Sequence, residues 1–368
     1  MNSTHLTLHD RFLTSTIFLN EDFFLSPYPE TRQEYLGFCE RREKDARAWR
    51  PYMGTPFSAG VVKQWRSFDL PCLTADPLSD NYRPIPALVQ HEAFLREGKI
   101  SLAMVHPLQI GTRKWSQVWR GSMKMSSADD VLQAAPVVIK IFQQSLFPDP
   151  FEYHSEAGGI DCGGWLTGAQ QARWEAWAFS RMKLLQGRRI PWSYGIFQII
   201  LPHGELAFVH VIEFVEGSSG KELRFGDATA TDFWALAEVL ASDFYNMTQC
   251  GVLHDDIMLS NLIVSPGDPH PVVSIDFAFA QPFTEADLDC GVFPIVYALR
   301  DMGMELDTIE AWFKDGITRG VPWSRMFVYQ SEKSPRWFKA LTGMITPDHA
   351  AEEVLKIFNR CLLPAVTE

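Results

Sequence analysis

The chain of 368 residues, 46% of them hydrophobic and 21% charged, is long enough to bury the core of one large domain or of two medium ones. Its formal net charge of −12 at pH 7 argues against a general nucleic-acid-binding protein, because such a protein needs a basic surface to displace the counterions of the phosphate backbone. No apolar run approaches the roughly 20 residues that a membrane-spanning helix needs, so we expect no membrane partner.

The N-terminus lacks the basic-then-apolar order of a signal peptide. The six cysteines are scattered and form neither a Cys-x-x-Cys pair nor a metal-ligand spacing, so we interpret them as reduced thiols. Since disulfides persist mainly in oxidising compartments, these features indicate an intracellular protein. We expect it in the cytoplasm, a nuclear location stays open, and the sequence does not predict an oligomeric state.

Residues 1–99 are rich in proline and aromatic residues and carry no catalytic motif. Phe, Trp and Tyr are too frequent there for a solvated tail, so we expect an ordered N-terminal extension that wraps on the core.

From residue 100 onward the pattern predicts strands. Apolar residues recur at strand spacing in 101–110 and in 117–124. The run 135–142, APVVIKIF, is typical of a buried strand and is interrupted by Lys140. Because a lysine is almost never fully buried without a partner, we expect Lys140 to belong to a site.

Residues 169–186 predict a helix, because they are rich in helix formers, contain no glycine or proline, and are followed by Gly187 as a cap. The acidic residue of this segment, Glu175, has apolar neighbours three and four positions later, which indicates an inward-leaning face. A carboxylate on such a face needs a cation. Lys140 on the preceding strand is the obvious candidate.

The rest of the chain predicts one hairpin and several helices. Residues 193–201 and 205–214 flank a Pro-His-Gly turn and predict a hairpin. Residues 230–249 repeat apolar side chains at helical spacing and predict an amphipathic helix. Further helices are expected near 290–302, 306–314, 335–344 and 347–363.

Residues 251–280 hold the densest set of candidate catalytic residues. Two short β-rich runs on either side of a Pro/Gly turn predict a hairpin, with strands at 261–264 and 272–275. Asp256 and Asn261 lie before and at the start of the first strand. Asp276 directly follows the second strand, so all three side chains lie at strand ends, where the backbone can aim them.

With His254 and Phe277 included, the stretch has the pattern His-x-Asp-x-x-x-x-Asn followed, after one hairpin, by Asp-Phe. This pattern resembles the catalytic loop and the metal-binding loop of the protein-kinase-like superfamily. The resemblance covers residues 100–280 in consistent order. It implies a two-lobed α+β fold, with a small lobe of five antiparallel strands and one helix, and a mainly helical large lobe.

The domains implied by the resemblance are an N-terminal extension at 1–99, a small lobe at 100–214 and a large lobe at 215–368. The cofactors implied are ATP and Mg²⁺.

The resemblance also implies a role for each candidate residue. Asp256 would accept or orient the proton of the substrate hydroxyl, while Asn261 and Asp276 would hold Mg²⁺ through hard oxygen ligands. Lys140 would hold the α- and β-phosphates of ATP and would itself be positioned by Glu175.

Further contacts to the nucleotide are implied by two other segments. Gly111 and Val118 match the first glycine and the valine of the family's glycine-rich loop. Glu213 and Val215 lie in the segment that would link the lobes and pair with the adenine ring. His254 is expected to have a structural role, packing and hydrogen bonding rather than acting as an acid or base.

The chain also departs from the family's pattern. Arg113 and Ser116 replace two glycines of the loop, Met258 stands where a lysine often touches the γ-phosphate, and Ala278 replaces the glycine of Asp-Phe-Gly. No Ala-Pro-Glu tripeptide follows; instead Asp289 resembles the bracing aspartate of small-molecule kinases of the superfamily.

Two hypotheses therefore stay open. The first is an ATP- and Mg²⁺-dependent phosphotransferase, a kinase that acts on a hydroxyl of a protein or small-molecule acceptor. The second is a pseudokinase that serves as a nucleotide-binding or scaffolding module.

Overall fold

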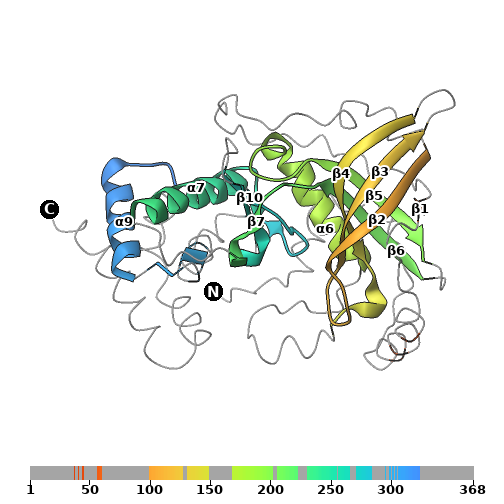
Figure 1. Cartoon of the computed structure of the whole chain (residues 1–368). Helices are drawn as coiled ribbons and strands as arrows, with labels where there is room; N and C mark the ends of the chain where they lie inside the picture. Colours follow the sequence, from red (N-terminus) through yellow and green to blue (C-terminus); the bar gives the residue numbers. More distant parts are fainter. Residues whose placement is uncertain are drawn as a thin grey trace. The chain divides into compact units, whose positions relative to one another are not determined.

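The computed structural model describes residues 37, 40, 44, 56–59, 99–126, 131–148, 168–201, 205–222, 230–254, 256–265, 271–283, 295, 298, 299, 301, 303, 304 and 306–323. These residues are mixed α+β with antiparallel sheets (Figure 1). They fall into two units, which we describe separately. Unit 1 extends to Val215 and takes in Phe277–Phe279, and unit 2 begins at Glu216. The sequence had placed the boundary between the lobes at 214/215.

Unit 1 is built on an antiparallel sheet of six strands in the order β1–β2–β3–β4–β6–β5 (Figure 1). The strands are β1 Pro56–Ala59, β2 Lys99–Gln109, β3 Gln117–Ser126, β4 Val131–Phe142, β5 Ser193–Ile200 and β6 Leu206–Glu213. Strands β2 to β6 agree with those expected from the sequence.

The expected sheet of five strands was one strand too small, because β1 comes from within residues 1–99. It pairs antiparallel with β2, from Pro56 opposite Ala103 to Ala59 opposite Ile100. A four-residue strand offers too short an alternation to recognise in a sequence. Its initial proline is tolerated because β1 lies at the edge of the sheet.

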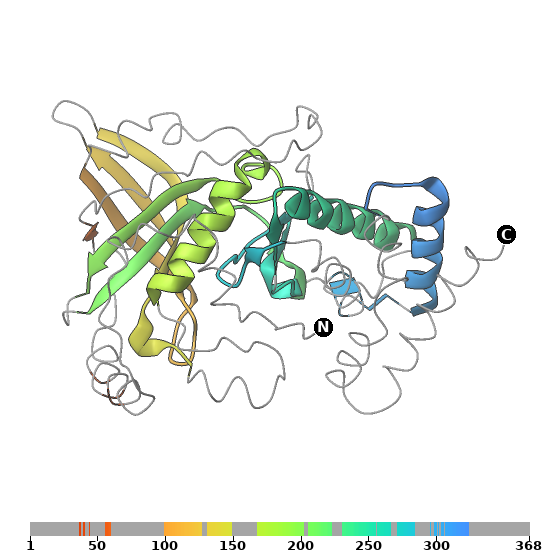
Figure 2. The same ribbon diagram turned by 180° about the vertical axis from the view of Figure 1, so that it is seen from behind.

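The sheet has two different faces, because side chains alternate along each strand. On β4, Ile139 and Ile141 point to one face and pack with apolar residues of the neighbouring strands. Lys140 and Phe142 point to the other face, which helix α6 (Gly168–Arg181) covers (Figure 2). This alternation brings one lysine of an otherwise apolar strand under the helix.

Small residues allow α6 to approach the sheet closely. Three of its alanines pack against a cluster that contains Phe142, Ile196 and Phe208. A Cβ atom at Gly168 would lie only 2.9 Å from the carbonyl oxygen of Phe142.

The helix ends one turn earlier than the sequence indicated, at Arg181, and a 3₁₀ turn follows at Lys183–Leu185. The side chain of Gln186 explains this end. Its Nε2 donates to the carbonyl oxygen of Phe179 at 2.9 Å, which satisfies a carbonyl group of the last turn. Gly187, the expected cap, has a φ of 74°, a backbone conformation that favours glycine.

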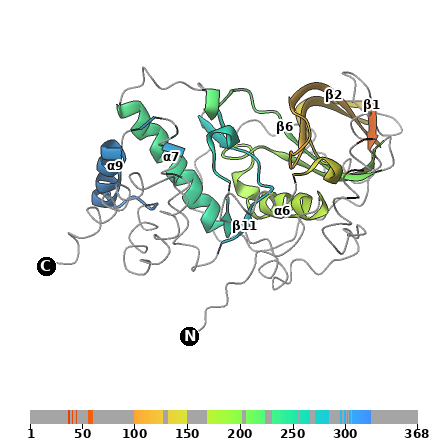
Figure 3. The same ribbon diagram turned by 90° about the horizontal axis from the view of Figure 1, so that it is seen from below.

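The described part of unit 2 includes two long helices, other helical residues and two small sheets (Figure 3). The elements are β7 Ser218–Ser219, α7 Ala230–Gln249, β8 Val252–Leu253, β9 Leu262–Val264, β10 Val272–Ser274, β11 Gln281–Pro282 and α9 Leu306–Arg319. Strands β10, β9 and β7 form one sheet, and β11 pairs with β8. Helix α7 and the β9–β10 hairpin confirm two of the elements expected from the sequence.

The core of unit 2 joins α7 to the hairpin and to α9. Leu240 and Phe244 of α7 belong to the same buried cluster as Leu262 of β9 and Trp312 of α9. Helix α9 is about one turn longer than expected and is followed by Gly320, whose φ is 64°. None of the helices in the described part of the chain is both long and apolar enough to cross a membrane.

Most of the remaining expected helices lie outside the residues that the structure describes. Within 290–302, residues 295, 298, 299 and 301 are described and are helical. The helices expected at 335–344 and 347–363 lie outside the described residues, as does Asp289.

Candidate active site

Lys140 and Glu175 form the buried ion pair that the sequence predicted. Lys140 Nζ lies 2.6 Å from Glu175 Oε2, and the two residues are 3% and 0% exposed. A separation this short is typical of a hydrogen bond assisted by charge on both partners. Strand β4 supplies the cation and α6 supplies the carboxylate, so both are carried by rigid elements.

The surroundings keep the Glu175 carboxyl ionised. Burial by itself would raise the pKa of the Glu175 carboxyl, but the charge of Lys140 and the contact with His210 outweigh burial and lower that pKa to about 2. The Lys140 ammonium also lies 5.1 Å from the ring centroid of Phe142, within range of a cation–π contact. Glu175 is therefore a carboxylate at neutral pH.

The strand register places Val118, Lys140 and His210 in one row across three neighbouring strands. Val118 of β3 is opposite Lys140 of β4, which is in turn opposite His210 of β6. Register partners point to the same face, so the row lies on the face that α6 covers. Sequence reasoning singled out Val118 and Lys140 but missed His210. In the sequence, His210 could have been recognised as a polar residue at a buried position of a strand that was expected to lie next to Lys140.

The loop at 111–116, which was expected from the sequence to match a glycine-rich loop, is tied to the strand that follows it. The N–H of Gly111 donates to Gln117 Oε1, and Gln117 Nε2 donates to the carbonyl oxygen of Gly111, both at 2.8 Å. The N–H of Lys114 donates to the carbonyl oxygen of Leu146 at 3.1 Å. Two backbone donors that a phosphate could have used are therefore already occupied.

Aromatic contacts and backbone conformation add to this closure. The Trp115 ring makes edge contacts with Phe147 and Phe279, at centroid distances of 5.2 and 5.6 Å. Gly111 has a φ of 128°, which requires glycine, whereas Arg113 adopts a φ of 59° despite its side chain. The loop is thus a compact turn with defined partners.

The segment after β6 holds Glu213 and Val215. Glu213 anchors the start of β5, since its N–H donates to the carbonyl oxygen of Trp192 and its carboxylate accepts from the N–H of Trp192, at 2.8 and 3.0 Å. Val215 is 9% exposed, and its backbone N–H and C=O make no hydrogen bond with any residue the structure describes. The Glu213 N–H is therefore already used, whereas the Val215 backbone groups have no partner within the described part of the chain.

In unit 2, Asp256 and Asn261 are brought together as expected. Asn261 Nδ2 donates to the backbone oxygen of Asp256 at 2.8 Å and to its Oδ2 at 3.0 Å. A 3₁₀ turn, Leu259–Asn261, places the amide there, and Asn261 is 7% exposed. Because the amide nitrogen is used, its Oδ1 is the atom left to bind a cation; the Ser260 hydroxyl lies 3.5 Å from it.

His254 connects this turn to the end of β10. The N–H of Asp256 donates to His254 Nδ1 at 3.3 Å, so Nε2 carries the proton and donates to the carbonyl oxygen of Ile275 at 3.0 Å. The N–H of Ile275 donates to the carbonyl oxygen of Asn261 at 2.9 Å. His254 is 1% exposed and hydrogen-bonded at both ring nitrogens, which agrees with the packing and hydrogen bonding expected for it.

Asp276 follows Ile275 with a φ of 64°, in the left-handed region that residues other than glycine rarely adopt. In the described part of the chain, Arg113 is the other non-glycine residue with a positive φ. Such a conformation costs about 1–3 kcal/mol and persists where the surroundings impose it, commonly at functional sites. The two hydrogen bonds of the Ile275 backbone are the restraints next to it.

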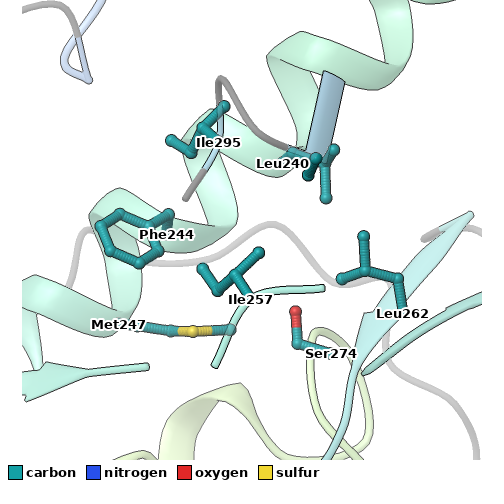
Figure 4. A pocket seen from close by; sticks show the side chains of 8 residues that line it. Leu240, Phe244, Met247, Ile257, Leu262, Ser274 and Ile295 are labelled. Atoms are coloured by element: carbon teal, nitrogen blue, oxygen red, sulfur yellow. The ribbon is translucent and has the colours of Figure 1, made fainter. Parts of the chain in front are cut away.

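A small apolar pocket lies beneath the hairpin and supports these residues (Figure 4). It offers about 10 Å³, room for no more than about one water. Ile257 and Leu262, each next to a candidate residue, point into it together with Phe244 of α7. The pocket is therefore packing under the loop and not a ligand site.

The donor atoms of unit 2 are suited to Mg²⁺. Asp256, Asn261 and Asp276 offer two carboxylates and one amide oxygen, and Mg²⁺ prefers hard oxygen ligands completed by substrate phosphates. Among the residues that the structure describes, no three His, Cys, Asp or Glu side chains gather into a metal site. The described residues thus show a contact between Asp256 and Asn261 and no cluster of three such side chains around a common point.

Comparison with known proteins adds no assignment. Neither the protein-family models nor the curated proteins compared with this chain match it.

Proposed function

We propose that the protein is an ATP- and Mg²⁺-dependent phosphotransferase of the protein-kinase-like type, which transfers the γ-phosphate to a hydroxyl group. The observation that carries this proposal is the Lys140–Glu175 pair, buried and 2.6 Å apart. A buried ion pair adds little stability compared with apolar residues of similar size. Its position between β4 and α6 is better explained by the need to hold one ammonium group in a fixed place.

The residues of unit 2 would supply the remaining chemistry. The Asp256 carboxylate would accept the proton of the acceptor hydroxyl, and a positioned base is worth about 10²–10⁴-fold in rate. Asn261 Oδ1 and the Asp276 carboxylate would hold Mg²⁺, which when bound spreads the charge of the transferred phosphoryl group. In this proposal units 1 and 2 correspond to the small and large lobes of a kinase-like fold.

For the nucleotide, Lys140 would contact the α- and β-phosphates and Val118, next to it in the row, would contact the base or ribose. The open backbone groups of Val215 support its proposed pairing with adenine. Glu213 would serve as the anchor that fixes this segment. The acceptor stays open between a protein and a small molecule, and the missing Ala-Pro-Glu tripeptide favours a small molecule.

A pseudokinase is the second candidate, and the closed Gly111–Gln117 turn favours it. Backbone N–H groups that would bind phosphate are engaged within unit 1. Met258, where a cation would assist transfer, is 49% exposed and apolar. Such a chain could bind a nucleotide, or a protein partner, without transferring phosphate.

Thermal unfolding with ATP, in the presence and absence of Mg²⁺, tests both candidates. A ligand at 100 times its Kd stabilises the folded state by about 2.7 kcal/mol, which is a shift of several degrees. A phosphotransferase predicts stabilisation that needs Mg²⁺ and is lost in Asp276→Asn, together with consumption of γ-labelled ATP. Stabilisation without turnover favours the nucleotide-binding module, and no response to any nucleotide excludes the enzyme and leaves a scaffold.

A further inference from the structure

The second oxygen of Glu175 faces a histidine that the proposed reaction has not used. Lys140 donates to Oε2 of Glu175, while Oε1 of Glu175 lies 3.4 Å from Nδ1 of His210. Glu175 and His210 are both fully buried, and neither of these two atoms has a hydrogen bond among the described residues. Since buried polar atoms are normally paired, each is the natural partner of the other.

Glu175 and Ser193 together indicate which ring nitrogen of His210 carries the proton. Ser193 Oγ lies 2.8 Å from His210 Nε2 and accepts the N–H of Gly195 at 3.3 Å. Glu175 Oε1 belongs to a carboxylate, which can only accept, so its contact with His210 requires the proton on Nδ1. Nε2 is then an acceptor, and the Ser193 hydroxyl donates its hydrogen to it.

The ring is also held in orientation by its neighbours. His210 lies opposite Lys140 in the β4–β6 register, and its ring meets Phe179 edge-on at a centroid distance of 4.8 Å. Phe179 follows Glu175 by one turn of α6, so strand and helix together restrict rotation of the imidazole. A contact of 3.4 Å is slightly long for an N–H···O hydrogen bond, and a small carboxylate movement would complete it.

We propose that His210 is a positioning residue. With Nδ1 protonated and Nε2 accepting from Ser193, it holds Oε1 of Glu175 so that Oε2 remains directed at Lys140. An outer partner of this kind orients the group that touches the ligand, as is common around metal sites and catalytic residues. The effect on catalysis rests on the proposed phosphotransfer, whereas the tautomer and the contact with Glu175 do not.

The tautomer is tested by NMR on protein labelled with ¹⁵N in its histidine rings. We expect His210 to be protonated on Nδ1 and unprotonated on Nε2, and Ser193→Ala to shift this population. His254 is an internal comparison, because its hydrogen bonds require the opposite tautomer. The His210 signals are assigned by their loss in His210→Gln. A His210 ring protonated on Nε2 in the wild type would overturn the proposal, whether or not the protein is a kinase.

The positioning role is tested with two substitutions at the same site. His210→Gln keeps a donor for Glu175 and an acceptor for Ser193, whereas His210→Leu keeps only the volume. We expect His210→Leu to raise KM for ATP, or Kd where turnover is absent, by about tenfold, and His210→Gln to stay within about threefold of the wild type.

Val209→Ala is the control for lost packing. Val209 is fully buried on the opposite face of β6, so its truncation reduces stability without touching Glu175. KM or Kd for ATP should then be unchanged. Equal changes of KM or Kd in the Gln and Leu variants would mean that His210 acts through packing alone. If the wild type neither binds nor consumes ATP, the proposed function fails while the NMR result still decides whether His210 holds Glu175.

Discussion

Removing the charge of Lys140 should reverse the sign of the contribution that the Glu175 carboxyl makes to the pH dependence of the unfolding free energy. In the wild type, the Glu175 carboxyl has a pKa lowered from 4.5 to about 2. A lowered pKa in the folded state gives stability that is present above pH 4.5 and is lost as the pH falls toward 2. The difference between the two values corresponds to about 3 kcal/mol.

In Lys140→Met the carboxyl loses the cation that outweighed burial, so burial raises its pKa above 4.5 instead. The sign then reverses: the variant keeps its stability at low pH and loses it as the pH rises through 4.5. An unpaired buried charge costs about 3–5 kcal/mol at neutral pH.

Urea unfolding between pH 4 and 8, followed by tryptophan fluorescence, measures this difference. The quantity to compare is the unfolding free energy of the variant minus that of the wild type, because surface groups contribute equally to both. Lys140→Met with Glu175→Leu is the matched control, since it removes both charges and should recover most of the stability. A difference below about 1 kcal/mol, or one that does not grow with pH, would refute a carboxylate buried in the folded state.

Three further predictions concern the proposed reaction. Asp256→Ala should keep ATP binding, measured by calorimetry, and lower turnover by about 10²–10⁴-fold, because only the base is removed; lost binding would argue against that role. Met258→Lys should raise the rate of γ-phosphate transfer by about tenfold, since a cation would face the developing charge. An unchanged rate would mean that residue 258 does not lie near the transferred phosphate. Gln117→Ala frees the N–H of Gly111 and should change both the Trp115 fluorescence and the affinity for ATP, whereas a silent variant would mean that the Gln117 amide does not hold the loop.

Local patterns predicted much of the fold. Helix α7 was predicted with its observed bounds, Ala230–Gln249, because apolar residues repeat at helical spacing over its full length. The Lys140–Glu175 contact could be predicted because each is a charged residue at a position that its element buries.

What could not be predicted depends on side-chain geometry or on pairing between distant segments. The Gln117 side chain that closes the Gly111 turn leaves no periodic signal, since any of several residues could have reached that backbone. His210 becomes notable only when the register places it opposite Lys140. The positive φ of Asp276 is likewise a result of how β10 ends and not of residue preference alone.

The first strand of the sheet has a consequence for how the chain can be shortened. By pairing with β2, Pro56–Ala59 covers main-chain groups at Ile100–Ala103 that would otherwise form an unpaired strand edge. An unpaired edge can pair with a strand of a second molecule, which leads to aggregation. A chain trimmed to begin at the first residue of β2 would retain every residue proposed for catalysis but would expose this part of the β2 edge, so we expect it to aggregate more readily than the full chain.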